Sequence, residues 1–218
     1  VLLICDQSGL IGKEHFAIDG CKLPTDASKQ WSGTHAELRK KSDKMKQAAI
    51  KIVNRHISND STKSGKKTLD EEKQQTIDTL LANAKKIDQF LATNQPRMGK
   101  GKRPQEVQSN ITDNESAKMT TSKGTIQAMA FVTAADEKHQ IIIGAQGFGM
   151  GQEQATLKPM IEGIKHNLGD AIFDTSVVLT ADTGFSSEAN MQYLFEENIN
   201  AVIPDNQFRK RNPIFTES

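Results

Sequence analysis

The stretch from Val177 to Leu194, VVLTADTGFSSEANMQYL, limits the possible folds of this chain most strongly. Its apolar run leads to Asp182, and a glycine turn and a helix signature follow. This order is typical of a buried strand with a carboxylate at its C-terminal tip, where open α/β sheets place their chemistry. The stretch His15–Ile18 has the same character and ends at Asp19. The sequence therefore predicts two aspartates at strand ends; an aspartate that only caps a turn is the alternative for each.

The composition narrows the class of protein. The 218 residues suffice for one large domain, or for one domain with an insert. The formal net charge is only +1, so a nucleic-acid surface would have to come from local basic clusters. Aromatic residues make up 5%, which argues against a surface that stacks single-stranded bases. The cysteines, Cys5 and Cys21, form neither a metal-ligand pattern nor a disulfide framework.

Targeting signals are not visible in the sequence. No apolar run approaches the roughly 20 residues of a membrane span, and nothing resembles a signal peptide. With the unpatterned cysteines, this predicts a reduced, cytoplasmic location, associated with the nucleoid if the protein acts on DNA. The chain starts at Val1 within a stretch that resembles the end of a helix, with Gly9 or Gly12 as its C-cap. It stops at Ser218 without a terminating element, so we expect the chain to be a fragment.

Residues 34–93 predict a helical hairpin. Thr34 with Glu37, and Thr68 with Glu71, form two capping boxes. Residues at helical spacing follow each box: Leu38, Met45, Ala49, Ile52, Val53 and His56, then Ile77, Leu80, Leu81, Ala84, Ile87 and Leu91. We expect these two stripes to pack on each other. Basic residues crowd the other face of the first helix, which is interpreted most simply as a solvated face, although it could contact phosphates.

Two further clusters of basic residues are candidates for contact with a DNA backbone. Residues 94–110 combine proline, glycine and basic residues, which is typical either of a flexible connector or of a loop that binds phosphate. The candidate residues are Lys102 and Arg103 in this loop and Arg209, Lys210 and Arg211 near the C-terminus. Ordinary solvated charge is the alternative for all five.

The remaining elements define the expected fold class. Strands are predicted at 126–135 and 140–146, with a turn at 136–139, and an amphipathic helix at 157–168. The glycines of GFGMG lack the spacing of a dinucleotide fingerprint and predict a mobile loop. We expect a helix that begins at Ser186 or Ser187 and buries Met191, Leu194 and Phe195, followed by a strand at 201–204. Earlier in the chain, residues 20–33 predict an irregular loop.

Without the hairpin, the element order is β-β-β-α-β-α-β, an antiparallel trio followed by right-handed crossovers. This is the order of a ribonuclease H-like mixed sheet, an α/β fold, here with a helical hairpin inserted between the first and second strands. In such a sheet the first and fourth strands are neighbours. The order therefore predicts that Asp19 and Asp182 meet at one edge of the sheet.

Neighbouring carboxylates repel each other unless a cation lies between them. Hard oxygen ligands select Mg²⁺ or Mn²⁺, and a pair of such ions stabilises the attacking and leaving oxygens of a phosphodiester displacement. Asp19 and Asp182 are therefore the candidate catalytic and metal-binding residues. The five histidines are scattered without ligand spacing, and no Ser/His/Asp or Cys/His constellation is evident.

Five blocks, in order, resemble bacterial insertion-sequence transposases of the DDE class: DGCKLPTDASKQWSGT, QSNITDNESAKM, DEKHQIIIGAQGFGMGQEQATLKPM, LTADTGFSSEANMQYL and IPDNQFRKR. The closest resemblance is to the group with a helical insert after the first catalytic Asp. It implies metal-dependent cleavage and strand transfer at insertion-sequence ends. The implied partners are double-stranded DNA, both terminal inverted repeats and target DNA, and a second copy in a homodimer. Asp19 matches the first catalytic Asp and Asp182 the second.

The resemblance divides the chain into three parts. Residues 1–33 hold an upstream helix end and the first strand, residues 34–110 hold the helical insert and the basic linker, and residues 111–218 hold the rest of the core. It also implies a third acid, a Glu on a later helix, which has no match here. Glu217 does not fit this role, because Pro213 precedes it and no helix is predicted around it. Glu188 is better explained as an acidic residue in the first turn of a helix, where the helix dipole favours a negative charge. We therefore expect this chain to bind metal weakly and turn over little.

Other departures from the family pattern are local. Ala128 and Met129 stand where relatives often have Gly-Tyr, and Asp113 and Glu115 are interpreted as a structural turn. Two alternative functions stay open: a catalytically inactive DNA-binding remnant of a transposase, and a metal-dependent nuclease of the same fold.

Overall fold

The computed structural model describes residues 1–60, 71–99, 103–174, 176–211 and 213–215. The chain divides into two compact units. The first, here called the sheet unit, consists of Val1–Thr25 and Lys118–Ser218, and the second, the hairpin unit, is Asp26–Ala117. The hairpin unit is therefore an insertion between two segments of the sheet unit.

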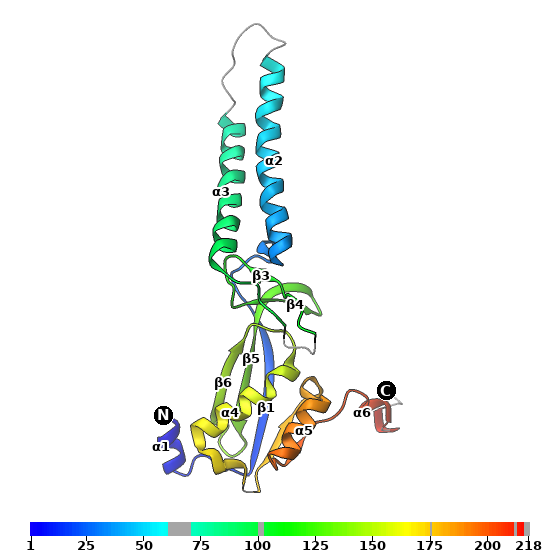
Figure 1. The fold of residues 1–218 in the computed structure, drawn as a ribbon. Coiled ribbons are helices and arrows are strands. Elements are labelled where there is room, and N and C mark those ends of the chain that lie inside the picture. The colour runs from blue at the N-terminus through cyan, green and yellow to red at the C-terminus, as the bar shows by residue number, and fades with distance from the viewer. Residues whose placement is uncertain (61–70, 100–102, 175, 212, 216–218) are drawn as a thin grey trace. The chain divides into compact units, whose positions relative to one another are not determined.

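A mixed sheet forms the centre of the sheet unit (Figure 1). Its strands are β1 (His15–Pro24), β4 (Ala117–Thr121), β5 (Gly124–Asp136), β6 (Ile142–Phe148), β7 (Val178–Ala181) and β8 (Ala201–Val202). The strand order is β4-β5-β1-β7-β8, and β6 also pairs with β5. Strand β5 is antiparallel to both β1 and β6, whereas β7 is parallel to β1 and to β8. The predicted α/β class with a mixed sheet is confirmed, and β4 is a strand that the sequence pattern did not indicate.

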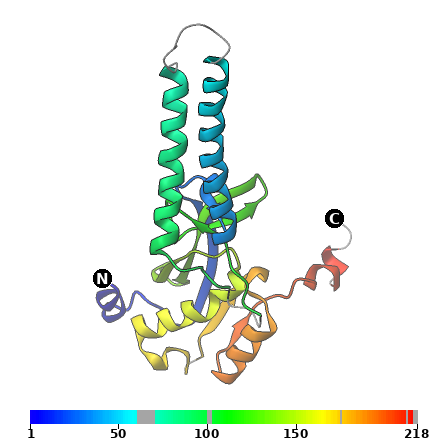
Figure 2. The ribbon, with the colours of Figure 1, turned by 45° about the horizontal axis from the view of Figure 1, so that its top comes forward.

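Helices connect the parallel strands of the sheet unit. The α-helices are α1 (Leu2–Gln7), α4 (Leu157–Leu168), α5 (Glu188–Glu196) and α6 (Phe208–Arg211), and the 3₁₀ turns are η2 (Glu153–Ala155), η3 (Asp170–Phe173), η4 (Thr183–Phe185) and η5 (Pro213–Phe215). Helix α4 leads from β6 to β7 and packs against β5 and β6, as Figures 1 and 2 show. Helix α5 then leads from β7 to β8 and contacts α4.

The two faces of the sheet differ in burial. Alternate strand residues on the face next to α4 are buried, among them Phe16, Ile18, Val132, Ala134 and Leu179. Residues of the opposite parity are exposed: Ala17, Asp19, Cys21, Phe131, Thr133 and Ala145. Because successive side chains of a strand point to opposite faces, this alternation defines one covered face and one open face.

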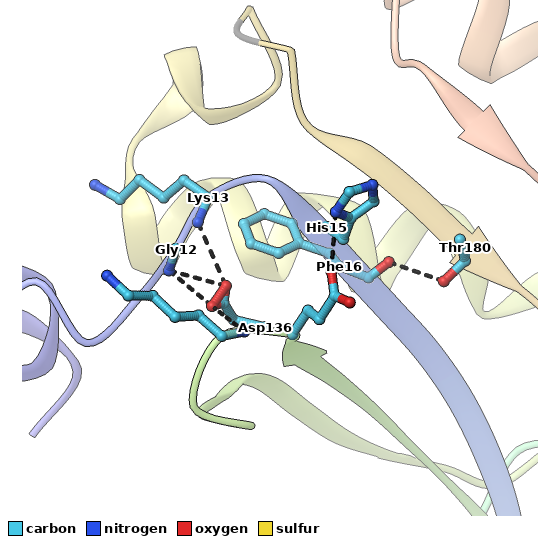
Figure 3. A network of polar contacts seen from close by, with 8 residues as sticks. Gly12, Lys13, His15, Phe16, Asp136 and Thr180 are labelled. Carbon is cyan, nitrogen blue, oxygen red and sulfur yellow. Dashed lines mark hydrogen bonds and ion pairs between the residues drawn. The ribbon is translucent and has the colours of Figure 1, made fainter.

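A buried carboxylate fixes the start of β1 against the end of β5 (Figure 3). Asp136, only 1% exposed, accepts hydrogen bonds from the Gly12 N–H at 2.7 and 3.0 Å and from the Lys13 N–H at 3.3 Å. A Cβ at Gly12 would lie 2.9 Å from Lys138 Cβ, so a side chain there would clash. On the other side of β1, Thr180 Oγ1 donates to the Phe16 carbonyl oxygen at 3.2 Å. These contacts help to set the register of β1 between β5 and β7.

Several sequence predictions for the sheet unit are confirmed and others are wrong. Gly9, at φ +67°, closes α1, and the Ser187 side chain caps α5 by accepting from the Asn190 N–H. Residues 20–24 were expected in a loop, but they continue β1 because β5 extends far enough to pair with them. Within α5, Leu194 is buried as expected, whereas Met191 is 39% and Phe195 86% exposed.

The hairpin unit contains two long helices, as predicted: α2 (His35–Asp60) and α3 (Glu71–Thr93). The short elements η1 (Lys29–Trp31), β2 (Ser32–Gly33) and β3 (Ser109–Asn110) complete it. The first capping box is confirmed, because the Thr34 N–H donates to Glu37 Oε2 at 2.9 Å and the Glu37 N–H to Thr34 Oγ1 at 3.3 Å. Thr68 of the second box lies outside the described residues.

Apolar and polar contacts both join α2 to α3. Leu38, Ile87 and Phe90 form a buried cluster against which Trp31 and Met45 pack. Predicted core residue Leu81 is instead 45% exposed. A fully buried hydroxyl, Ser42 Oγ, donates to Asp88 Oδ1 at 2.7 Å, and Lys46 Nζ lies 2.7 Å from Asp88 Oδ2.

We expect the hairpin to lose stability in acid through Asp88. Hydrogen bonds from Lys46 and then Ser42 lower the pKa of Asp88. A carboxyl with a lowered folded-state pKa stabilises the fold above its unfolded-state pKa, and this contribution is lost as pH falls through the folded-state value. Thermal unfolding monitored by Trp31 fluorescence between pH 7 and pH 2 should therefore show a smaller decrease in Tm for Asp88→Asn than for the wild type. Equal decreases would contradict this role for Asp88.

Candidate active site

Asp19 was expected at a strand end, but it lies inside β1, because pairing with β5 continues that strand to Pro24. Asp182 directly follows β7, which is parallel to β1. In the register of β1 and β7, Ile18 is the partner of Ala181, and each aspartate is the next residue along its chain. Both side chains are exposed. Two aspartates that are 163 positions apart in sequence, at 19 and 182, thus have neighbouring backbone positions because of one parallel strand pair.

Local hydrogen bonds orient both carboxylates. Asp19 Oδ1 accepts from the Gly20 N–H at 2.7 Å. Asp182 is the N-cap of η4, and its Oδ1 accepts from the Gly184 N–H at 2.8 Å. The glycine turn that the sequence indicated after Asp182 therefore holds this carboxylate by a backbone N–H.

A third carboxylate, Glu153, lies beside the glycines that follow the two aspartates. It begins η2, after β6 and before α4. A Cβ placed on Gly184 would lie 2.1 Å from Glu153 Oε2 and 3.0 Å from Asp182 Oδ1, and one on Gly20 would lie 3.8 Å from Glu153 Cγ. The Glu153 side chain therefore occupies the space left by the glycines that follow the two aspartates.

Burial and neighbouring charges change the pKa of Glu153. Burial raises the pKa of Glu153, and the charges of Asp182 and, more weakly, Asp19 raise it further. The ammonium group of Lys22 acts in the opposite direction and lowers the pKa of Glu153. Lys22 Nζ itself donates to the Thr120 carbonyl oxygen at 3.4 Å, which holds this lysine beside β4.

Glu153→Gln should stabilise the protein at neutral pH in the absence of divalent cations. The folded-state pKa of Glu153 is raised, so the ionised carboxylate is disfavoured by folding, and this loss of stability appears as pH rises through the raised pKa. Thermal unfolding in EDTA should give a higher Tm for Glu153→Gln than for the wild type at pH 8, with a smaller difference at pH 4. The control is Glu196→Gln, an exposed glutamate of α5. An unchanged or lower Tm at pH 8 would mean that Glu153 is not under this repulsion.

Strand geometry explains how the three carboxylates are distributed. Asp19 belongs to the open face of the sheet, whereas Glu153 approaches Gly20, the next residue, whose Cβ direction is toward the covered face. Accordingly, the part of the chain that the structure describes contains no group of three or more His, Cys, Asp or Glu side chains close enough to hold a metal ion. The carboxylate oxygens of Asp19 and Asp182 are ligands of the type that a hard divalent cation such as Mg²⁺ or Mn²⁺ prefers.

Sequence reasoning missed Glu153, although the sequence holds a signal for it. Both aspartates are followed by glycine within two residues, as Gly20 and Gly184. Glycine leaves room for a close approach by another group, but it does not say which segment supplies that group. The remaining acids have other roles: the Asp113 carboxylate accepts from the Ser116 N–H at 3.2 Å in a turn, as predicted, and Glu188 begins α5. Glu217 lies outside the described residues.

The predicted basic residues occupy different environments. Arg103 is exposed in the hairpin unit, and Lys102 lies outside the described residues. Arg209, Lys210 and Arg211 are exposed on the four-residue helix α6. Arg211 forms an ion pair with Asp205, and the Arg209 guanidinium lies 5.7 Å from the centre of the Phe208 ring.

Arg97 of the basic loop makes structural contacts. Its guanidinium donates to the carbonyl oxygens of Asn114 at 2.7 Å and Ser116 at 2.9 Å. The Val107 N–H also donates to the Arg97 carbonyl oxygen at 2.8 Å. This arginine therefore stabilises the loop from within the hairpin unit.

No protein family, curated protein or solved structure matched this chain. Within the described residues, no helix combines the length and the apolar character needed to cross a membrane.

Proposed function

We propose that this chain is the catalytic core of a DDE-class transposase, which cleaves phosphodiester bonds and transfers strands at insertion-sequence ends. The observation that supports the proposal is the adjacency of Asp19, in β1, and Asp182, directly after the parallel strand β7. This is the arrangement that the resemblance to insertion-sequence transposases predicts for the first two catalytic acids.

The topology of the sheet supports a ribonuclease H-like core. Strands β1, β5 and β6 form an antiparallel trio, and β7 and β8 follow through helical crossovers. The hairpin unit interrupts the chain between the first two long strands of this trio. Both features agree with the element order expected from the sequence.

Asp19 and Asp182 would hold the divalent cation, and Glu153 lies beside the glycines that follow them without completing a group of three metal-binding side chains. When bound, the cation would supply charge stabilisation at the phosphoryl oxygens. The backbone N–H groups of Gly20 and Gly184 keep the two aspartates oriented, and Lys22 offsets part of the negative charge around Glu153.

A joining assay tests the proposed activity. The chain would be incubated with Mn²⁺, a labelled duplex that carries the inverted repeats flanking its gene, and a supercoiled target plasmid. The expected product is plasmid with covalently joined label, because strand transfer requires both an insertion-sequence end and a target DNA. Nicked plasmid without joined label would favour the nuclease alternative. Binding to the labelled duplex without either product would favour the inactive remnant.

A further inference from the structure

We propose that the outer face of α2 binds the phosphate backbone of double-stranded DNA. The face consists of four side chains, Lys40, Lys44, Lys51 and Arg55, here called the basic stripe. The choice of DNA as partner rests on the proposed function, whereas the binding surface is argued from the hairpin unit alone.

The basic stripe follows from helical periodicity. The four residues stand at positions i, i+4, i+11 and i+15 of α2, and all four are exposed. At 3.6 residues per turn these positions fall within an arc of about 60° and extend over about 22 Å of the helix axis. Gln47 and Asn54, which are also exposed, lie along the same face.

Lys41 and Lys46 of α2 have partners, whereas within the described residues the side chains of the basic stripe do not. Lys41 Nζ lies 4.7 Å from the centre of the Trp31 ring, and Lys46 pairs with Asp88. Among the residues that the structure describes, no hydrogen bond or ion pair involves a side chain of the basic stripe.

The acidic groups of α2 do not neutralise this face. Glu37 shares its direction, but its carboxylate accepts from the Thr34 N–H in the capping box. Asp43 lies about 60° to one side of Lys40 around the helix. Overall α2 has seven basic and three acidic residues, in a chain whose formal net charge is +1. Positive charge is therefore concentrated on this helix.

The spacing of the basic stripe works against the isolated helix. Lys40 with Lys44, and Lys51 with Arg55, are like-charged pairs at i and i+4, a spacing at which like charges destabilise a helix. A polyanion bound along the stripe would remove this repulsion. The two pairs are separated by about 10 Å along the axis, which is close to the ~12 Å width of the major groove. The pairs can therefore contact phosphates on both sides of one groove.

Salt-dependent binding tests the inference. Anisotropy of a fluorescent 30-bp duplex would be measured with the full chain in EDTA, over a series of KCl concentrations. Substituting all four stripe residues by Gln should reduce the slope of log K against log[KCl] by about three to four, since each phosphate contact contributes about 0.9. Affinity should fall at least tenfold at the lowest salt. The matched control removes four exposed lysines elsewhere: Lys73→Gln, Lys85→Gln, Lys86→Gln and Lys123→Gln.

The control carries the same change in net charge and should alter the slope by less than about one. The inference would be overturned if the stripe variant and the wild type gave equal slopes. It would also be overturned if the stripe variant and the control lost the same amount of slope and affinity. If circular dichroism shows lost helicity in the fourfold variant, Lys40→Gln/Lys44→Gln and Lys51→Gln/Arg55→Gln are compared, and each should lower the slope by about two. Because EDTA removes catalysis from the assay, the result is independent of the proposed cleavage and joining.

Discussion

Asp19→Asn and Asp182→Asn should each reduce Mn²⁺-dependent cleavage and joining of DNA by at least about a hundredfold, the scale of losing one electrostatic contact to a transition state. Both substitutions remove a negative charge while keeping the size of the side chain. An asparagine oxygen can still accept from the Gly20 or Gly184 N–H, and asparagine caps helical turns as well as aspartate does. The fold should therefore persist while cation binding is lost.

Two measurements separate this effect from misfolding. Cleavage and joining products would be quantified on gels, and Mn²⁺ binding would be followed by the decrease in the free-ion electron paramagnetic resonance signal. Asp174→Asn, at an exposed aspartate of the same unit, is the matched control and should behave like the wild type. Full activity in either site variant would exclude that residue from the site, and unchanged Mn²⁺ binding in both would exclude the carboxylate pair as a cation site.

Asp182→Asn also has an expected effect without any cation. The charge of Asp182 raises the pKa of Glu153 more than that of Asp19 does. The pKa of Glu153, followed by carbon-detected NMR of its carboxyl group in EDTA, should therefore fall toward its ordinary value in Asp182→Asn, and less in Asp19→Asn. The reverse order would contradict the geometry described for Glu153.

Phe16→Ala should destabilise the sheet unit by about 3–5 kcal/mol, the usual range for removing a buried aromatic side chain. Phe16 is fully buried on the covered face, and its ring lies 6.1 Å from that of Phe173 in an edge-to-face arrangement. Its carbonyl oxygen also accepts the hydrogen bond from Thr180 that joins β1 to β7. A cavity at this position would weaken the strand pair that brings the two aspartates together.

The matched control is Phe131→Ala on the open face of the same sheet. Phe131 is 39% exposed, so its loss should cost no more than about 1.5 kcal/mol. Amide hydrogen exchange of β5 would report the stability of the sheet unit, and Trp31 fluorescence would report the hairpin unit separately. Equal losses of protection for the two variants would show that the sheet is not covered on one face only.

Features that depend on short stretches of sequence were predictable. The capping box of Thr34 and Glu37, the N-cap at Ser187 and the glycine closing α1 at Gly9 all form as expected. Each is decided by residues within one helical turn, where hydrogen-bond geometry leaves few alternatives. The strand that ends at Asp182 was predictable for a similar reason, since an apolar run followed by a glycine turn specifies a strand end locally.

Burial on surfaces formed by distant segments was less predictable. Met191 and Phe195 fit a helical stripe with Leu194, yet only Leu194 faces the core of the sheet unit. Residues 20–24 have the polar and proline-containing sequence of a loop, but pairing with β5 extends them as strand. In both cases the packing partner, which the local pattern does not contain, determined the outcome.

The sequence by itself determined the long helices and most strands of one α/β sheet, and that Asp19 and Asp182 directly follow apolar strand residues. It determined neither β4 nor the continuation of β1 beyond Asp19. Only the tertiary structure decided that Glu153 lies close to the two aspartates, because its position depends on η2 packing into space that Gly20 and Gly184 leave empty. Such a contact links three segments that are remote along the chain. Its energy comes from packing between them, so no local pattern of residues could encode it.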